Sequence, residues 1–151
     1  MKKILYILLL LTQVVYSQTR LDSLVLKELN SYRTSLNLQP VSFTKDCFNV
    51  SEKNTDSMLI VKNTIFHSEN FIRAEVVNRV VVKIDINEKD VDSILAIEII
   101  KSWKSSEKHN KILISPKYKF VGSSSKILRE TKGFNGKMIK MYEVLSTMNF
   151  K

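Results

Sequence analysis

The chain has 151 residues, of which 44% are hydrophobic and 26% are charged, and its formal net charge is +9. With three Gly, two Pro and one Cys, and with no apolar run of about 20 residues, it is not a collagen-like, low-complexity, disulfide-scaffold or bilayer-spanning chain. A chain of this size buries roughly 70% of the surface that its unfolded form exposes, so one globular domain with an ordinary apolar core is expected.

Residues 1–17 have the three parts of a secretory signal peptide. Two lysines are followed by an apolar segment, Ile4–Val15, and Val15 and Ser17 occupy the positions that a signal peptidase reads. We therefore expect a mature domain of residues 18–151 that is secreted, in an extracellular or periplasmic compartment. After cleavage, no transmembrane segment is expected.

Two helices are predicted in the first part of the domain. Apolar residues recur every three or four positions over residues 21–36, which is typical of an amphipathic helix, and Thr19 with Asp22 is expected to cap its first turn. Pro40 ends this pattern, and a more polar helix is expected over residues 46–61. The residues expected on the buried faces are Leu21, Val25, Leu29, Tyr32 and Leu36 in the first helix and Cys47, Val50, Met58 and Val61 in the second.

Strands dominate the rest of the chain. β-branched residues alternate with polar ones over residues 76–86, which predicts a strand, and a strongly apolar helix is expected over 91–103. Two further strand-like runs, 118–127 and 138–150, are joined by a turn at 133–136. Helices first and strands closing the chain predict an α+β domain with α/β/α layers.

For several residues we expect a role in stabilising the fold and not in binding or catalysis. Cys47 has no partner for a disulfide bond, and a buried, inert thiol is favoured over a catalytic thiolate. Asn30 and Arg33 are expected to hold the first helix in place through hydrogen bonds. Trp103 is interpreted as a core residue, and Glu98 as a partner of a basic side chain or a solvated residue.

The basic residues are concentrated near the end of the chain. Without residues 1–17, there are 22 basic and 15 acidic residues, and eight of the basic ones lie from Lys111 to Lys140 with Glu130 as the single acid. The aromatic residues there do not repeat at the spacing of a base-stacking platform, so no nucleic acid partner is expected. A solvated strand face is favoured, and binding of an anionic envelope polymer or a lipid surface is the alternative.

The common local signatures of catalytic and phosphate-binding sites are absent from the sequence. Its two histidines, His67 and His109, are 42 residues apart. Two imidazoles brought together with a carboxylate can bind zinc or move a proton near neutral pH. The spacing alone is weak evidence for such a site.

Five segments in one order resemble the CAP domain of cysteine-rich secretory and pathogenesis-related proteins, also called SCP-like. The resemblance is closest to the short, cysteine-poor bacterial members, and it covers about Leu21 to Phe150. Its most specific part is the block in which Trp103, Ser106 and His109 follow one another at intervals of three. The five segments are residues 29–33, 40–43, 67–68, 74–76 and 103–113.

The resemblance implies an α/β/α three-layer sandwich with a central antiparallel sheet and a cleft lined by two histidines and two acids. His67 and His109 match the two histidines, and Glu75 matches the first acid. Ser106 stands where the second acid is found, and Ala74 and Val76 replace the Gly and Asn that flank the family's Glu. The ligand-binding cleft implied here is thus His67, Glu75, Ser106 and His109, with His67, His109 and Glu75 as ligands of a divalent metal such as zinc.

Three functions are compatible with these residues. The favoured one is a secreted, non-catalytic binding module whose cleft takes a divalent metal or a small ligand. The second is a metal-assisted hydrolase in which Glu75 activates water. The third is a basic adhesion module for anionic envelope polymers that uses the residues from Lys111 to Lys140.

Overall fold

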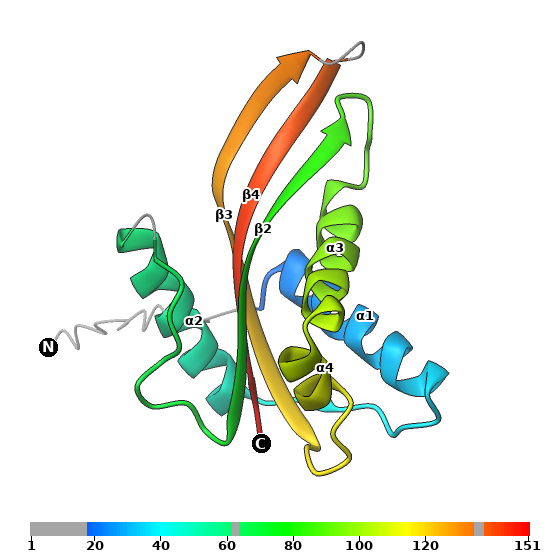
Figure 1. The fold of residues 1–151 in the computed structure, drawn as a ribbon, viewed down its shortest axis with the longest axis vertical. Helices are drawn as coiled ribbons and strands as arrows, with labels where there is room; N and C mark the ends of the chain where they lie inside the picture. Colours follow the sequence, from blue (N-terminus) through cyan, green and yellow to red (C-terminus); the bar gives the residue numbers. More distant parts are fainter. Residues whose placement is uncertain (1–17, 62–63, 135–137) are drawn as a thin grey trace, which may run out of the picture.

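The computed structural model describes residues 18–61, 64–134 and 138–151, so the predicted signal peptide lies outside the described residues. Helices enclose a sheet within these ranges (Figure 1). No described helix has both the length and the apolar character needed to cross a membrane. The helices are α1 (Arg20–Ser35), α2 (Lys45–Ile60), α3 (Val91–Ser105) and α4 (Glu107–Leu113), and the strands are β1 (Ser42–Phe43), β2 (Ala74–Asp85), β3 (Phe120–Phe134) and β4 (Met138–Phe150).

The sheet has the strand order β1-β3-β4-β2. β4 lies between β3 and β2 and is antiparallel to both, and the two residues of β1 run parallel to β3. Pairing between β2 and β4 extends from Ala74 opposite Phe150 to Asp85 opposite Ile139. The expected α/β/α sandwich with a central, mainly antiparallel sheet is therefore confirmed.

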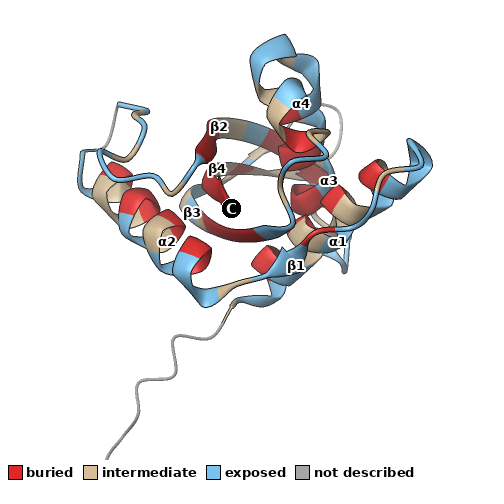
Figure 2. Ribbon diagram, turned by 90° about the horizontal axis from the view of Figure 1, so that it is seen from below, coloured by how far each residue is buried: buried red, intermediate tan, exposed pale blue. Residues whose placement is uncertain are grey.

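The two faces of the sheet are covered to different extents. α1, α3 and α4 lie on one face and α2 on the other, with the buried residues between them (Figure 2). Figure 1 shows that the strands continue past the end of α2. As a result Ala74–Asn78 is buried on both faces, whereas farther along β2 the side chain of Val82 is buried and that of Val81 is 63% exposed.

Helix α1 begins with the predicted capping box. The Thr19 side chain accepts a hydrogen bond from the Asp22 backbone N–H, and the Asp22 carboxylate accepts one from the Thr19 backbone N–H. Three of the predicted core residues, Leu21, Val25 and Leu29, are buried. The prediction for Leu36 is wrong, because the helix ends before this residue and its side chain is 44% exposed. Tyr32 is only half-buried.

Helix α2 packs on the sheet through a face that is more polar than predicted. Cys47 and Met58 are buried as expected, but Val61 follows the end of the helix and is 50% exposed. The helix lies very close to β3, because a Cβ atom built on Gly122 would be 2.1 Å from the backbone N of Phe48. The face buried against the sheet consists of Cys47, Phe48, Ser51, Asn54, Thr55 and Met58.

Two elements differ from their predicted form. β3 extends to Phe134, beyond the predicted end at Ile127, because its charged second half is paired with β4 along its length past an irregularity between Ile127 and Arg129. The helix α4 was not predicted, since seven residues carry too little periodicity. The predicted turn at 133–136 falls partly on residues outside the described ranges.

The structural roles predicted for single residues are confirmed. The Asn30 side chain exchanges two hydrogen bonds with the backbone of Val41, at 2.9 and 2.8 Å. Trp103 and Cys47 are fully buried, and burial raises the pKa of the Cys47 thiol to about 11. Glu98 forms an ion pair of 3.0 Å with Lys101.

Candidate functional site

Glu75 is a buried carboxylate near the start of β2, and its side chain is 1% exposed. Its Oε1 accepts hydrogen bonds from the Ser68 hydroxyl at 2.6 Å and from the Asn149 amide at 3.0 Å. Its Oε2 accepts one from the Ser68 backbone N–H at 2.8 Å and lies 3.0 Å from Nδ1 of His67. These four contacts compensate for the loss of water around the carboxylate.

His67 lies on the segment that enters β2, and the structure places it directly against Glu75. An ionised carboxylate only accepts hydrogen bonds, so Nδ1 of His67 carries the ring hydrogen and donates a hydrogen bond to Glu75. In the neutral ring, Nε2 then keeps its lone pair. Since the His67 side chain is 58% exposed, it is accessible to a ligand from solvent.

His109 comes from the other side of the sheet, on α4. The pKa of this half-buried imidazole is lowered from 6.5, first because burial disfavours the charged form and second because the charge of His67 opposes its own. Although the two histidines are 42 residues apart in the sequence, the fold brings them near enough for the charge of His67 to affect the pKa of His109.

Contacts from α1 hold α4 in position. The guanidinium of Arg33, which is 1% exposed, donates a hydrogen bond of 2.6 Å to the backbone oxygen of Leu113. The Tyr32 hydroxyl donates one of 2.9 Å to Asn110, the residue after His109. The predicted stabilising role of Arg33 thus extends to the helix that carries His109.

Ser106, the fourth predicted cleft residue, is the N-cap of α4, and its hydroxyl accepts a hydrogen bond from the His109 backbone N–H at 3.5 Å. The side chain of Glu107 is 82% exposed and paired with Lys111, so it does not replace the missing second acid. Among the residues that the structure describes, no group of three or more His, Cys, Asp or Glu side chains is placed to hold a metal ion.

Two contributors to the site were not singled out from the sequence. Ser68 supplies two of the four hydrogen bonds to Glu75, and Asn149 supplies another. Asn149 is fully buried between the apolar residues Met148 and Phe150, at the end of a strand that also buries Ser146 and Thr147. A polar residue inside such a strand was the available signal, because buried amides require partners.

Several basic side chains of the segment from Lys111 to Lys140 form ion pairs with acidic side chains. Four of its side chains are paired with acids of other segments or of the neighbouring strand. Surface pairs of this kind contribute little stability, but they reduce the positive charge available to a polymer. The pairs are Lys111 with Glu107, Lys126 with Asp56, Arg129 with Glu143 and Lys140 with Glu130.

Comparisons with solved structures show the same fold in bacterial proteins. An outer surface protein from Borrelia burgdorferi is similar with a TM-score of 0.53 and 13% identity, over 89% of this chain and 95% of that one. An extracellular protein from Bacillus anthracis that contains an SCP domain is similar with a TM-score of 0.50 and 14% identity, over 85% of this chain and 40% of that one. At these identities the likeness shows the fold alone.

Sequence comparison identifies the family. No curated protein sequence matches the chain. The family model described as the cysteine-rich secretory protein family, CAP, matches residues 26–134, which is more than half of the chain. The resemblance found in the sequence is confirmed, and the chain belongs to the cysteine-rich secretory protein (CAP) family.

Proposed function

We propose that the protein is an extracellular binding module whose His67 and His109 imidazoles bind a divalent metal ion of the zinc type. The observation that carries this proposal is the 3.0 Å contact between Nδ1 of His67 and the buried carboxylate of Glu75. Metal-binding histidines adopt this arrangement, because a carboxylate on one ring nitrogen fixes the tautomer and makes the other nitrogen a better ligand.

Glu75 acts in this proposal as a positioning residue and not as the direct metal ligand that the family resemblance implies. Both of its oxygens are already engaged by Ser68, His67 and Asn149, and ligation would break these contacts. Two imidazoles fill only part of the coordination of zinc, so water or a small polar ligand would complete it. The same Nε2 atom of His67 also suits a small ligand that donates a hydrogen bond.

The extracellular location rests on the signal-peptide pattern of residues 1–17 and on the similarity to chains described as outer surface and extracellular proteins. Export and cleavage predict a secreted chain that begins near Gln18. Intact-mass analysis of the culture supernatant tests this. A product in the cytosol that begins at Met1 would contradict it.

The two alternatives have less support from the described contacts. A hydrolase in which Glu75 activates water needs a carboxylate that reaches water, and this side chain is 1% exposed with four hydrogen-bonding contacts. An adhesion module needs free positive charge, and four of the seven basic side chains that the structure describes between Lys111 and Lys140 are paired with acids.

The metal proposal is tested by titration calorimetry with zinc chloride at neutral pH. We expect saturable binding that weakens below about pH 6.5, because the imidazoles must be neutral to bind a metal. His67→Gln and His109→Gln should each remove measurable binding, and the double variant should lose little more than either single one. Glu75→Gln should weaken binding about tenfold or more, as expected for a residue that orients a ligand.

Glu98→Gln is the matched control, because it makes the same chemical change at an acid that is paired with Lys101 on α3. It should bind zinc as the wild type does. Wild-type protein without measurable zinc binding at neutral pH would show that the proposal is wrong. Two single histidine variants that bind as tightly as the wild type would show the same.

A further inference from the structure

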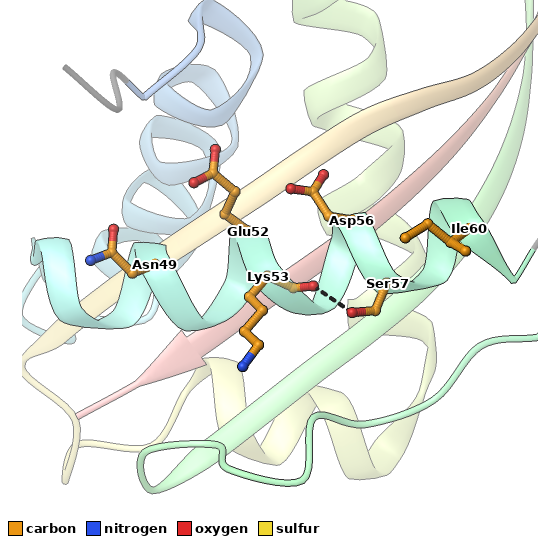
Figure 3. A pocket seen from close by; sticks show the side chains of 6 residues that line it. All are labelled: Asn49, Glu52, Lys53, Asp56, Ser57 and Ile60. Atoms are coloured by element: carbon orange, nitrogen blue, oxygen red, sulfur yellow. Dashed lines mark hydrogen bonds between the residues drawn. The ribbon is translucent and has the colours of Figure 1, made fainter. Parts of the chain in front are cut away.

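A second site lies on the α2 side of His67. A hollow of about 550 Å³, open to solvent, lies between α2 and the segment 66–70. Its volume lies within the range of pockets that hold small molecules. By contrast, a hollow of about 430 Å³ on the outer face of α2 is lined by side chains of that one helix alone (Figure 3), and a single helix cannot surround a ligand.

The walls of the 550 Å³ hollow, which we call the α2 pocket, are fixed by hydrogen bonds. The amide of Asn54, a buried residue of α2, donates a hydrogen bond of 3.1 Å to the backbone oxygen of Phe66. Two residues later, Ser68 donates its backbone N–H and its hydroxyl to Glu75 on β2. The segment is thus attached to α2 and to the sheet, and the pocket is formed before a ligand arrives.

The lining of the α2 pocket carries opposite charges around an apolar surface. Lys53 comes from α2 and Glu69 from the facing segment, and neither forms an ion pair with another described residue. Lys53 borders both hollows, and its side chain leaves the helix on the side away from Glu52 and Asp56 (Figure 3). The remaining lining includes the apolar side chains of Val50 and Phe66. A ligand that complements this lining has an anionic end, a cationic end and an apolar portion.

We propose that the α2 pocket binds a short zwitterionic peptide of two or three residues with apolar side chains. The Lys53 ammonium binds the peptide carboxylate, Glu69 binds its terminal ammonium, and Val50 and Phe66 contact its side chains. The volume exceeds that of a single amino acid, which is why a peptide of this length fits. His67 also lines the α2 pocket, so the pocket adjoins the proposed metal site but does not depend on it.

The test uses leucyl-leucine as the probe in an NMR titration of the ¹⁵N-labelled protein. Binding should be saturable at millimolar concentration or below and should shift the amide signals of Lys53, Asn54 and residues 66–70. Two neutralised probes separate the charges. N-acetyl-leucyl-leucine lacks the cation, leucyl-leucine amide lacks the anion, and each should bind about tenfold more weakly.

Variants of the pocket assign each charge to its partner. Lys53→Gln should bind leucyl-leucine about tenfold more weakly and no longer prefer it over the amide, and Glu69→Gln should no longer prefer it over the N-acetyl form. Both positions are exposed, so these variants should fold. Glu52→Gln, on the outer face of α2, is the matched control and should bind as the wild type does.

His109→Gln keeps this proposal separate from the metal site. It should lose zinc binding while its affinity for leucyl-leucine stays unchanged, because His109 does not line the α2 pocket. The proposal is wrong if leucyl-leucine does not bind saturably. It is also wrong if both neutralised probes bind as tightly as the zwitterion, or if the Lys53 and Glu69 variants keep the wild-type preferences.

Discussion

Asn149 donates a hydrogen bond of 3.0 Å from its side-chain amide to Oε1 of Glu75, the residue opposite it in the β2–β4 pair. The same amide donates to the Ser51 hydroxyl on α2 at 3.1 Å, and its oxygen accepts from the backbone N–H of Ile72 at 3.4 Å. One fully buried side chain therefore joins α2, β4 and the carboxylate that orients His67.

Replacing this amide by a carboxylate tests its role. Asn149→Asp places a second buried carboxylate against Glu75, where like charges repel and a donor is lost. We expect the free energy of unfolding at neutral pH to fall by about 3 kcal/mol. Part of the loss should be recovered in acid, where one carboxylate is protonated. Urea unfolding measures both, and Asn70→Asp at an exposed position should stay within about 0.5 kcal/mol of the wild type.

His67 should influence the titration of His109. Burial and the charge of His67 both lower the pKa of His109 from 6.5, and burial is the larger cause. The imidazole signals followed by NMR should therefore give His109 a pKa below 6.5 in the wild type. In His67→Gln the pKa should rise only part of the way back, because burial remains. A pKa that is unchanged in this variant would show that the two rings do not interact.

Asp22 should make stability depend on pH in the direction opposite to most carboxylates. Burial raises its pKa to about 6 from 3.8, although Thr19 and Ser125 donate hydrogen bonds to it. The folded state therefore binds the proton more tightly than the unfolded state. Its contribution is fully present below about pH 4 and is lost as the pH rises through about 6, by about 3 kcal/mol.

Asp22→Asn isolates this effect, because an amide cannot ionise. The unfolding free energy of the wild type minus that of the variant should fall by about 3 kcal/mol between about pH 4 and about pH 7, measured by urea unfolding. A difference that rises with pH would mean that the pKa of Asp22 is lowered in the folded state.

Of the two glycines that the structure describes, Gly122 should be the one that tolerates no side chain. A Cβ atom there would lie 2.1 Å from the backbone N of Phe48 and 2.6 Å from the backbone C of Cys47, and backbone atoms of a packed helix cannot move aside cheaply. Gly122→Ala should lower the free energy of unfolding by about 3 kcal/mol or more. Gly133→Ala, with its nearest contact at 3.9 Å, should be neutral or stabilising by about 0.5 kcal/mol in thermal or urea unfolding.

Two fully buried serines provide a matched pair. The Ser51 hydroxyl donates to the backbone oxygen of Gly122 at 2.8 Å and accepts from Asn149. The Ser146 hydroxyl has no hydrogen-bond partner among the described residues. Ser51→Ala should cost about 1 to 2 kcal/mol, because it leaves a buried amide N–H unpaired, whereas Ser146→Ala should change stability by less than about 0.5 kcal/mol. Equal losses in urea unfolding would contradict this assignment.

Most of the helices and strands could be predicted from the sequence. The strand β4 has its predicted bounds, and α1 with its capping box begins within one residue of the expected start. These features depend on local periodicity and on hydrogen bonds between residues three positions apart. The charged second half of β3 was missed, because its strand conformation comes from pairing with β4 and not from an apolar pattern of its own.

His67, Glu75 and His109 could also be predicted as cleft residues from the sequence, but only because the order of its segments resembles the CAP family. Their contacts come from the tertiary structure. The hydrogen bonds that occupy Glu75 come from Ser68 and from Asn149, 74 residues away, and the interaction of the two histidines depends on α4 being held by Arg33. A carboxylate becomes a ligand or a positioning group according to which donors surround it, and these donors are assembled only when distant strands pair.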